Sequence, residues 1–359
     1  MKVGIVGLPN AGKSSLFNAL TRAGAATANY PFTTIEPNVA VVPVADERLD
    51  RLAATVGASG TVHDTIDFHD IAGLVAGAHA GEGLGNQFLR NIRETDAIVH
   101  VVRAHGDDGV VLPDGRVDPA ADIDIVETEL IYADLEQAER RLERVERQAR
   151  GGDRVAIAEE AWLRDLIDAL RAGRPARTVP PPADAPRALA ALAQLSAKPV
   201  LFVANVDEGS DVVPDAVAAH ARDQGAVAIA VPARLEAELA ELGSDEAAAM
   251  RAELGVGESG LKRVVDGAFS LLDLIAFFTA GEDAPAQSLH MRRGLSAWHA
   301  AGKVHTDMQR GFVRAEVIGW QELVDAGGYT AARERGTLRL EGRDYVVADG
   351  DVITIKFSP

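Results

Sequence analysis

The stretch GLPNAGKS, residues 7–14, decides the fold of this chain. It matches the pattern G-x-x-x-x-G-K-[ST], follows the apolar run 3–6 and precedes the segment 14–23, whose apolar residues have helical spacing. A glycine-rich turn between a strand and a helix lets backbone N–H groups surround phosphate oxygens, while Lys13 supplies a cation. The stretch therefore predicts a P-loop, with the Ser14 hydroxyl available to Mg²⁺. The expected nucleotide contacts are Asn10, Ala11, Gly12, Lys13, Ser14 and Ser15.

A second motif, Asp70-Ile71-Ala72-Gly73, directly follows the strand candidate 65–68. An acidic residue at this strand end can hold Mg²⁺ through water, and the N–H of Gly73 can sense a γ-phosphate. Between the two motifs lies the loop 29–37, NYPFTTIEP, in which a threonine can complete the magnesium shell in the triphosphate state. We expect this ligand to be Thr34, with Thr33 as the alternative. The predicted metal ligands are Ser14, Thr34 and Asp70, and the predicted catalytic residues are Lys13, Asp70 and Gly73.

Strand candidates alternate with helix-forming segments, which predicts a doubly wound α/β sheet. The insert at about 125–195 interrupts this alternation of strands and helices with two helical segments joined by Gly151-Gly152-Asp153. Apolar residues at alternating three- and four-residue steps predict a coiled-coil hairpin there. Beyond Phe277 short strands with turn signals predict a small mixed β domain, so the expected domains are 1–275 and 276–359. The strand candidates are 39–44, 65–68, 97–102, 199–204, 226–231, 313–318, 337–340, 345–347 and 352–357.

Composition excludes several classes of protein. The 359 residues contain no cysteine, which rules out disulfides, thiolate zinc sites and thiol nucleophiles. No apolar run is long enough for a membrane span and no targeting segment is visible, so we expect a cytoplasmic chain, taken as a monomer, without membrane partners. The net charge of −18 argues against coating nucleic acid, and no DNA partner is expected.

The C-terminal domain is nearly neutral, with ten Lys/Arg and eleven Asp/Glu in residues 276–359. Basic residues in its first half alternate with aromatic ones, a pattern that could serve phosphate contact and base stacking. The other interpretation is that the aromatics are core and the basic residues solvated. The residues concerned are Arg292, Arg293, Lys303, Arg310 and Arg314, with Trp298, Phe312 and Trp320.

These motifs, read with the segment DIAGLVAGAHAGEGLGNQF at 70–88, resemble those of the Obg-related GTPases and, more specifically, the YchF family of Obg-like ATPases. The resemblance extends from the P-loop through the insert to the C-terminal segment, which resembles a TGS domain with a ubiquitin-like fold. It implies ATP as the nucleotide, contact with ribosome or RNA through the TGS domain, and Asn205 and Val206 beside the base.

The base-reading segment departs from the guanine pattern N-K-x-D. Here the strand ends in Asn205-Val206-Asp207-Glu208, so Val206 replaces the lysine and Glu208 carries the carboxylate one methylene further out. Adenine has no ring N–H for such a carboxylate, and unpaired buried polar groups cost about 1–3 kcal/mol each. We expect Asn205, Val206 and Glu208 to line the base site and ATP to be preferred, although Asp207 could replace the missing aspartate after a small backbone shift.

The water-activating group is not evident. Leu74 stands where Ras-like enzymes have a glutamine, and Leu112 stands where relatives often carry a histidine, so intrinsic hydrolysis should be slow. A potassium ion near Asn10, a switch-loop side chain or a partner could substitute, and His105 is interpreted as an ordinary loop histidine. Three functions remain open: an ATP-hydrolysing switch, a GTPase of the Obg kind, and a nucleotide-gated binding module with incidental hydrolysis.

Overall fold

The computed structural model describes residues 1–27, 38–71, 84–106 and 117–358. The contacts among these residues divide the chain into two compact units. The first unit contains residues 1–42 and 67–271, and the second contains residues 43–66 and 272–359. This division differs from the expected continuous domains 1–275 and 276–359.

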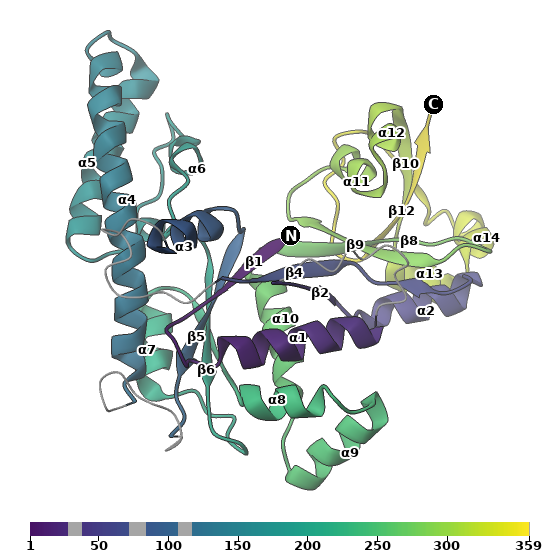
Figure 1. The fold of residues 1–359 in the computed structure, drawn as a ribbon. Helices are drawn as coiled ribbons and strands as arrows, with labels where there is room; N and C mark the ends of the chain where they lie inside the picture. The colour runs from purple at the N-terminus through teal and green to yellow at the C-terminus, as the bar shows by residue number, and fades with distance from the viewer. Residues whose placement is uncertain (28–37, 72–83, 107–116, 359) are drawn as a thin grey trace. The chain divides into compact units, whose positions relative to one another are not determined.

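The first unit is built on a six-stranded sheet with the order β2-β4-β1-β5-β6-β7 (Figure 1). The pairings of β4 with β1, β1 with β5, β5 with β6 and β6 with β7 are all parallel, so the carboxyl ends of these strands meet at one edge. The predicted strands are confirmed to within two residues. Their bounds are β1 Lys2–Val6, β2 Val39–Pro43, β4 Thr65–Asp70, β5 Ala97–Arg103, β6 Val200–Asn205 and β7 Val227–Val231.

Helices cover both faces of this sheet, which is why every residue of β5 and β6 is buried. On one face, α3, the first half of α4, and α7 bury Phe88, Ile123 and Val217 against Phe202. On the other face, α10 contacts β5, β6 and β7, and α1 contacts α8. The helices are α1 Lys13–Thr27, α3 Leu84–Arg93, α4 Pro119–Ala149, α5 Arg154–Arg171, α6 Ala188–Leu192, α7 Asp215–Asp223, α8 Ala233–Leu239, α9 Ser244–Leu254 and α10 Gly260–Leu271, with the 3₁₀ turn η1 Ala176–Thr178.

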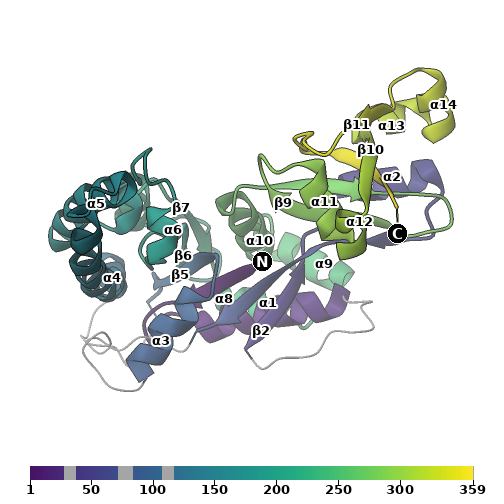
Figure 2. The same ribbon diagram turned by 90° about the horizontal axis from the view of Figure 1, so that it is seen from above.

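The predicted helical hairpin is present as α4 and α5, which lie side by side in both views (Figures 1 and 2). Ala138 and Val145 of the predicted seam are fully buried in one cluster with Leu163 and Leu166. The hairpin begins at Pro119 rather than near residue 125, because Asp118 caps α4 by accepting a hydrogen bond from Ala121 N–H. No described helix is long and apolar enough to cross a membrane.

The second unit contains a mixed six-stranded sheet with the order β11-β10-β12-β8-β9-β3. The pairs β12–β8 and β9–β3 are parallel, and β11–β10, β10–β12 and β8–β9 are antiparallel. The prediction of a strand at 345–347 is wrong. Val346 forms only an isolated bridge with Ser296. The elements are α2 Glu47–Val56, β3 Thr61–Val62, β8 Leu274–Thr279, β9 Ala286–Arg292, α11 Ala297–Val304, α12 Thr306–Arg310, β10 Phe312–Gly319, α13 Trp320–Ala326, α14 Tyr329–Glu334, β11 Arg339–Glu341 and β12 Asp351–Phe357.

Residues 43–66 belong to the second unit because their apolar side chains are buried there. Leu49, Leu52 and Val56 of α2 lie in the same core cluster as Phe278 of β8 and Val352 of β12. In addition, β3 extends the sheet by pairing with β9. The boundary predicted at residue 275 therefore missed a segment that is distant in sequence but part of the same core.

Candidate functional site

The P-loop lies between β1 and α1, at the edge where the parallel strands end. Three of its residues have positive φ: Gly7 at 154°, Asn10 at 64° and Gly12 at 97°. A Cβ atom on Gly7 would lie 2.3 Å from the carbonyl oxygen of Val101, and one on Gly12 would lie 2.2 Å from Nδ2 of Asn205. Both glycines are therefore required by close approach as well as by backbone conformation.

Lys13 and Asp70 act on each other electrostatically at this edge. Asp70 ends β4, whose register pairs it with Ile5 of β1, just before the P-loop. Lys13 is buried, and its Nζ donates a hydrogen bond to the Leu8 carbonyl oxygen at 2.8 Å. Burial lowers the pKa of Lys13, and Asp70 opposes that shift; burial raises the pKa of Asp70, and Lys13 opposes it. A cation and a carboxylate thus occupy the place where a phosphate–metal pair would bind.

The chemistry of the donors fits Mg²⁺. Ser14 offers a hydroxyl and Asp70 a half-buried carboxylate, both oxygen donors, and Mg²⁺ is usually held by one or two carboxylates with substrate phosphates and water. The described residues contain no cluster of three acidic, histidine or cysteine side chains that would form an all-protein metal cage. A bound Mg²⁺ would neutralise phosphate charge, while Lys13 and the loop amides position the phosphates.

Asn205 braces the P-loop against α8. Its Nδ2 donates to the Ala11 carbonyl oxygen at 3.1 Å, and its Oδ1 accepts from the Ala233 N–H at 3.0 Å. Both ends of the buried amide are therefore engaged with backbone groups. Asn205 thereby fixes the phosphate-binding loop relative to the start of α8, and its proximity to a nucleotide base stays a prediction.

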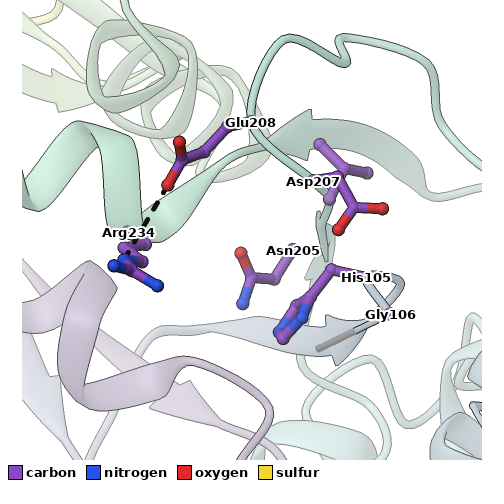
Figure 3. A pocket seen from close by; sticks show the side chains of 7 residues that line it. His105, Gly106, Asn205, Asp207, Glu208 and Arg234 are labelled. Atoms are coloured by element: carbon purple, nitrogen blue, oxygen red, sulfur yellow. Dashed lines mark ion pairs between the residues drawn. The ribbon is translucent and has the colours of Figure 1, made fainter. Parts of the chain in front are cut away.

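A cavity of about 540 Å³ opens beside Asn205 (Figure 3). Glu208 points toward Arg234, and the two side chains form an ion pair at 3.8 Å. Asp207 lies on the other side of the cavity, nearer His105. The cavity therefore offers carboxylates and a guanidinium to a polar ligand such as a nucleobase. Its lining residues are His105, Gly106, Asn205, Val206, Asp207, Glu208 and Arg234.

The structure brings most of the sequence-predicted site residues together. Asn10, Ala11, Gly12, Lys13, Ser14 and Ser15 form the P-loop and the start of α1, and Asn205, Val206 and Glu208 line the adjacent cavity. Thr33, Thr34, Gly73, Leu74 and Leu112 lie outside the described residues.

Sequence reasoning missed His105 and Arg234 as lining residues. His105 lies two residues after the end of β5 and Arg234 lies in the first turn of α8, so the available signal was their position just beyond two strands that end at the site.

The parallel sheet, the P-loop between β1 and α1, and the opposite charges of Lys13 and Asp70 at the same sheet edge define the chain as a P-loop NTPase. It is similar to the "Ribosome-binding ATPase YchF" of Bacillus subtilis (44% identical, 100% of this chain and 99% of the relative). It is also similar to the protein of the same description from Escherichia coli O157:H7 (46% identical, 99% of each chain). The chain belongs to the YchF family.

Family models and a solved structure agree with this assignment. Residues 2–142 match the model described as "50S ribosome-binding GTPase", and residues 274–358 match YchF-GTPase_C, described as a protein of unknown function. The solved structure of the Schizosaccharomyces pombe YchF GTPase superposes with a TM-score of 0.88 at 33% identity, covering 99% of this chain and 97% of that one.

Proposed function

We propose that this chain is a Mg²⁺-dependent ATPase that acts as a nucleotide-controlled switch and associates with the ribosome in the cytoplasm. The observation that carries the proposal is the P-loop itself, in which Gly7 and Gly12 are closely approached by other groups, Asn205 holds the Ala11 carbonyl oxygen, and the buried Lys13 lies in the electrostatic field of Asp70. The bacterial relatives are described as ribosome-binding ATPases, and their likeness over essentially the whole chain supports both activities.

The proposed roles follow the chemistry of each side chain. Lys13 binds the β- and γ-phosphates, Ser14 and Thr34 coordinate Mg²⁺, and Asp70 holds it through water. Gly73 senses the γ-phosphate through its N–H, so the segments that contain Thr34 and Gly73 would respond to hydrolysis.

The base is the first point to test, because the S. pombe structure is described as that of a GTPase and the bacterial relatives as ATPases. ATP and GTP should be competed against a fluorescent adenine nucleotide, with Mg²⁺ present. We expect ATP to displace the probe at lower concentration than GTP, because Glu208 carries its carboxylate one methylene further out than the guanine-binding aspartate and Val206 lacks a lysine stem. Tighter binding of GTP would instead identify a GTPase of the Obg kind.

A nucleotide-gated binding module is the second candidate function, and it is favoured by Leu74, which has no hydrogen-bonding group to orient water. Single-turnover ATP hydrolysis with and without purified ribosomes separates the two. Stimulation by ribosomes supports the ATPase switch. ATP-dependent ribosome association without stimulation supports the module. The same assay in potassium and in sodium buffers tests whether a monovalent ion near Asn10 supplies the missing activation.

A further inference from the structure

The end of the α4–α5 hairpin concentrates positive charge in an otherwise acidic chain. We define the hairpin tip as residues 140–157, which carry six arginines and three acidic residues. This segment has a net charge of +3, so the remainder of the chain carries −21. A local reversal of sign of this size marks a surface on which anions would accumulate.

The ion pairs of the hairpin engage Arg140 and Arg141 but leave the other four arginines of the tip without an acidic partner among the described residues. Arg141 binds Glu159 at 2.8 Å, Arg164 binds Glu146 at 2.7 Å, and Arg171 binds Glu139 at 2.7 Å. These pairs join the two helices. Four exposed arginines of the tip, by contrast, form no ion pair with any described carboxylate: Arg144, Arg147, Arg150 and Arg154.

Folding explains only part of this arrangement. Cations near the end of α4 stabilise the helix dipole, which accounts for Arg147. Arg154, however, is the first residue of α5, where the dipole disfavours a positive charge. Beside it, Val155 and Ile157 are 53% and 50% exposed, although exposed β-branched residues add nothing to helix stability. The tip therefore carries features that a ligand would explain and helix stability does not.

The tip is a well-packed platform at the end of a long arm. Val145 and Ala156 are buried in the same cluster as the rest of the helix seam, so the backbone that presents the arginines is fixed. Glu127, which contacts α7 through His220, lies about 35 Å along α4 from Arg150 at 1.5 Å per residue. In Figure 1 the hairpin projects away from the sheet of its own unit. The tip can therefore contact a large partner while the sheet holds nucleotide.

Two of the five basic residues in the C-terminal cluster already lie near acidic side chains. Arg293 pairs with Asp273 at 3.2 Å, and Arg310 lies 3.8 Å from Asp307. Phe312 and Trp320, which could have served base stacking, are half-buried and pack against core clusters of the second unit. These two aromatic residues therefore pack against the core, whereas Trp298 lies under the guanidinium of Arg343.

We infer that the hairpin tip binds the phosphate backbone of ribosomal RNA through Arg144, Arg147, Arg150 and Arg154. This inference rests on the proposed ribosome association and locates it on one surface. Guanidinium groups donate paired hydrogen bonds to phosphate oxygens, and such contacts release counterions, so binding should weaken steeply as salt rises.

The test compares two variants that each lose four positive charges. R144Q/R147Q/R150Q/R154Q alters the tip, and R292Q/R293Q/R310Q/R314Q alters the C-terminal cluster. Each is sedimented with purified bacterial ribosomes, and separately titrated with protein-free ribosomal RNA, in Mg²⁺ and a non-hydrolysable ATP analogue over a salt series. ATP affinity and circular dichroism show that each variant is folded.

We expect the tip variant to bind ribosomes and RNA at least about tenfold more weakly, with the slope of log K against log salt reduced by about three. The C-terminal variant should bind like the wild type. Four Arg→Lys substitutions at the tip should restore the salt slope, because they keep the charge.

The inference would be overturned if the tip variant bound ribosomes and RNA as tightly as the wild type. It would also be overturned if both variants lost the same affinity. Loss on ribosomes with unchanged RNA binding and unchanged salt slope would also overturn it, and would identify a ribosomal protein as the partner. If wild-type protein bound RNA but not ribosomes, the proposed ribosome association would fail while the role of the tip stood.

Discussion

At the scale of single residues, the P-loop combines a conformational requirement with a charge requirement. Gly12 is tied to the fold by its close approach to Asn205, and Lys13 is tied to the chemistry by its burial beside Asp70. The sequence motif predicted both residues because the chemistry of phosphate binding depends on a short, local pattern. It did not predict His105 and Arg234, since the cavity that they line is assembled from strand ends far apart in the chain.

Replacing Lys13 tests the charge requirement. Lys13→Ala removes a donor to phosphate, and hydrogen bonds with charged groups are worth about 1.5–3 kcal/mol, so ATP binding should weaken by about 10- to 100-fold. Turnover should fall with it. Nucleotide titration and phosphate release measure both, with Lys2→Ala, an exposed lysine on β1, as the control. Survival of both binding and turnover in Lys13→Ala would show that the site has been assigned wrongly.

Replacing Gly12 tests the conformational requirement. In Gly12→Ala the new Cβ would lie 2.2 Å from Asn205 Nδ2, so either the loop or its brace must shift. We expect ATP affinity to fall by at least about tenfold, as for a lost contact to a charged group. The matched control is Gly225→Ala, which also has positive φ, at 64°, but nothing within 4 Å of its Cβ. It should lose only about 1 kcal/mol of stability and keep its ATP affinity.

At the scale of secondary-structure elements, the hairpin is joined to the sheet by a partly buried cluster of polar residues. Glu127 of α4 pairs with Arg177 at 2.7 Å and with His220 of α7 at 3.1 Å, and Phe202 of β6 lies between His220 and His100 of β5. Strand and helix positions were predictable because their apolar periods are local. This cluster was not predictable, because its members come from five separate segments.

The cluster makes stability depend on pH through His100. Burial lowers the pKa of His100 to about 4, from an ordinary value of 6.5, against the opposing charge of Glu127; His220, Lys13 and Arg177 lower it further. As pH falls below 6.5 the unfolded chain takes up the proton first, so stability is lost progressively until pH 4, by up to about 3 kcal/mol. Urea unfolding at pH 7, 6 and 5 should show this loss, and His100→Leu should lack it.

His220 provides a comparison of opposite sign. Its hydrogen bond with Glu127 raises the pKa of His220 above 6.5, so it adds stability that is complete below pH 6.5 and fades as pH rises through the folded-state pKa. His220→Gln should therefore be most destabilising at pH 6 and below, and least at high pH. If the free energy of unfolding of His100→Leu fell between pH 6.5 and pH 4 as that of the wild type does, the burial of a neutral His100 would not be the cause of the loss of stability.

At the scale of the whole molecule, the chain leaves its first unit after residue 42 and returns at residue 67. Residues 43–66 contribute a strand to the sheet of the second unit, whose other strands lie beyond residue 273, and a helix to its core. Periodicity along the sequence identifies an amphipathic helix such as α2 but not the core that covers its apolar face. The sequence therefore predicted the C-terminal part of the second unit to within four residues, but not that residues 43–66 belong to it.

Leu52→Ala tests this division of the chain. Leu52 is fully buried with Phe278 and Val352, so its truncation should cost the second unit about 2–5 kcal/mol, although the substitution lies more than two hundred residues from β8. Amide hydrogen exchange should quicken in Leu274–Thr279 and Asp351–Phe357 while Val200–Asn205 stays protected. Leu20→Ala, at a fully buried position of α1, should show the reverse pattern. The strands that lose protection are those whose core has lost the side chain. If Leu52→Ala instead quickened exchange in Val200–Asn205 and left Leu274–Thr279 unchanged, residues 43–66 would belong to the nucleotide-binding unit.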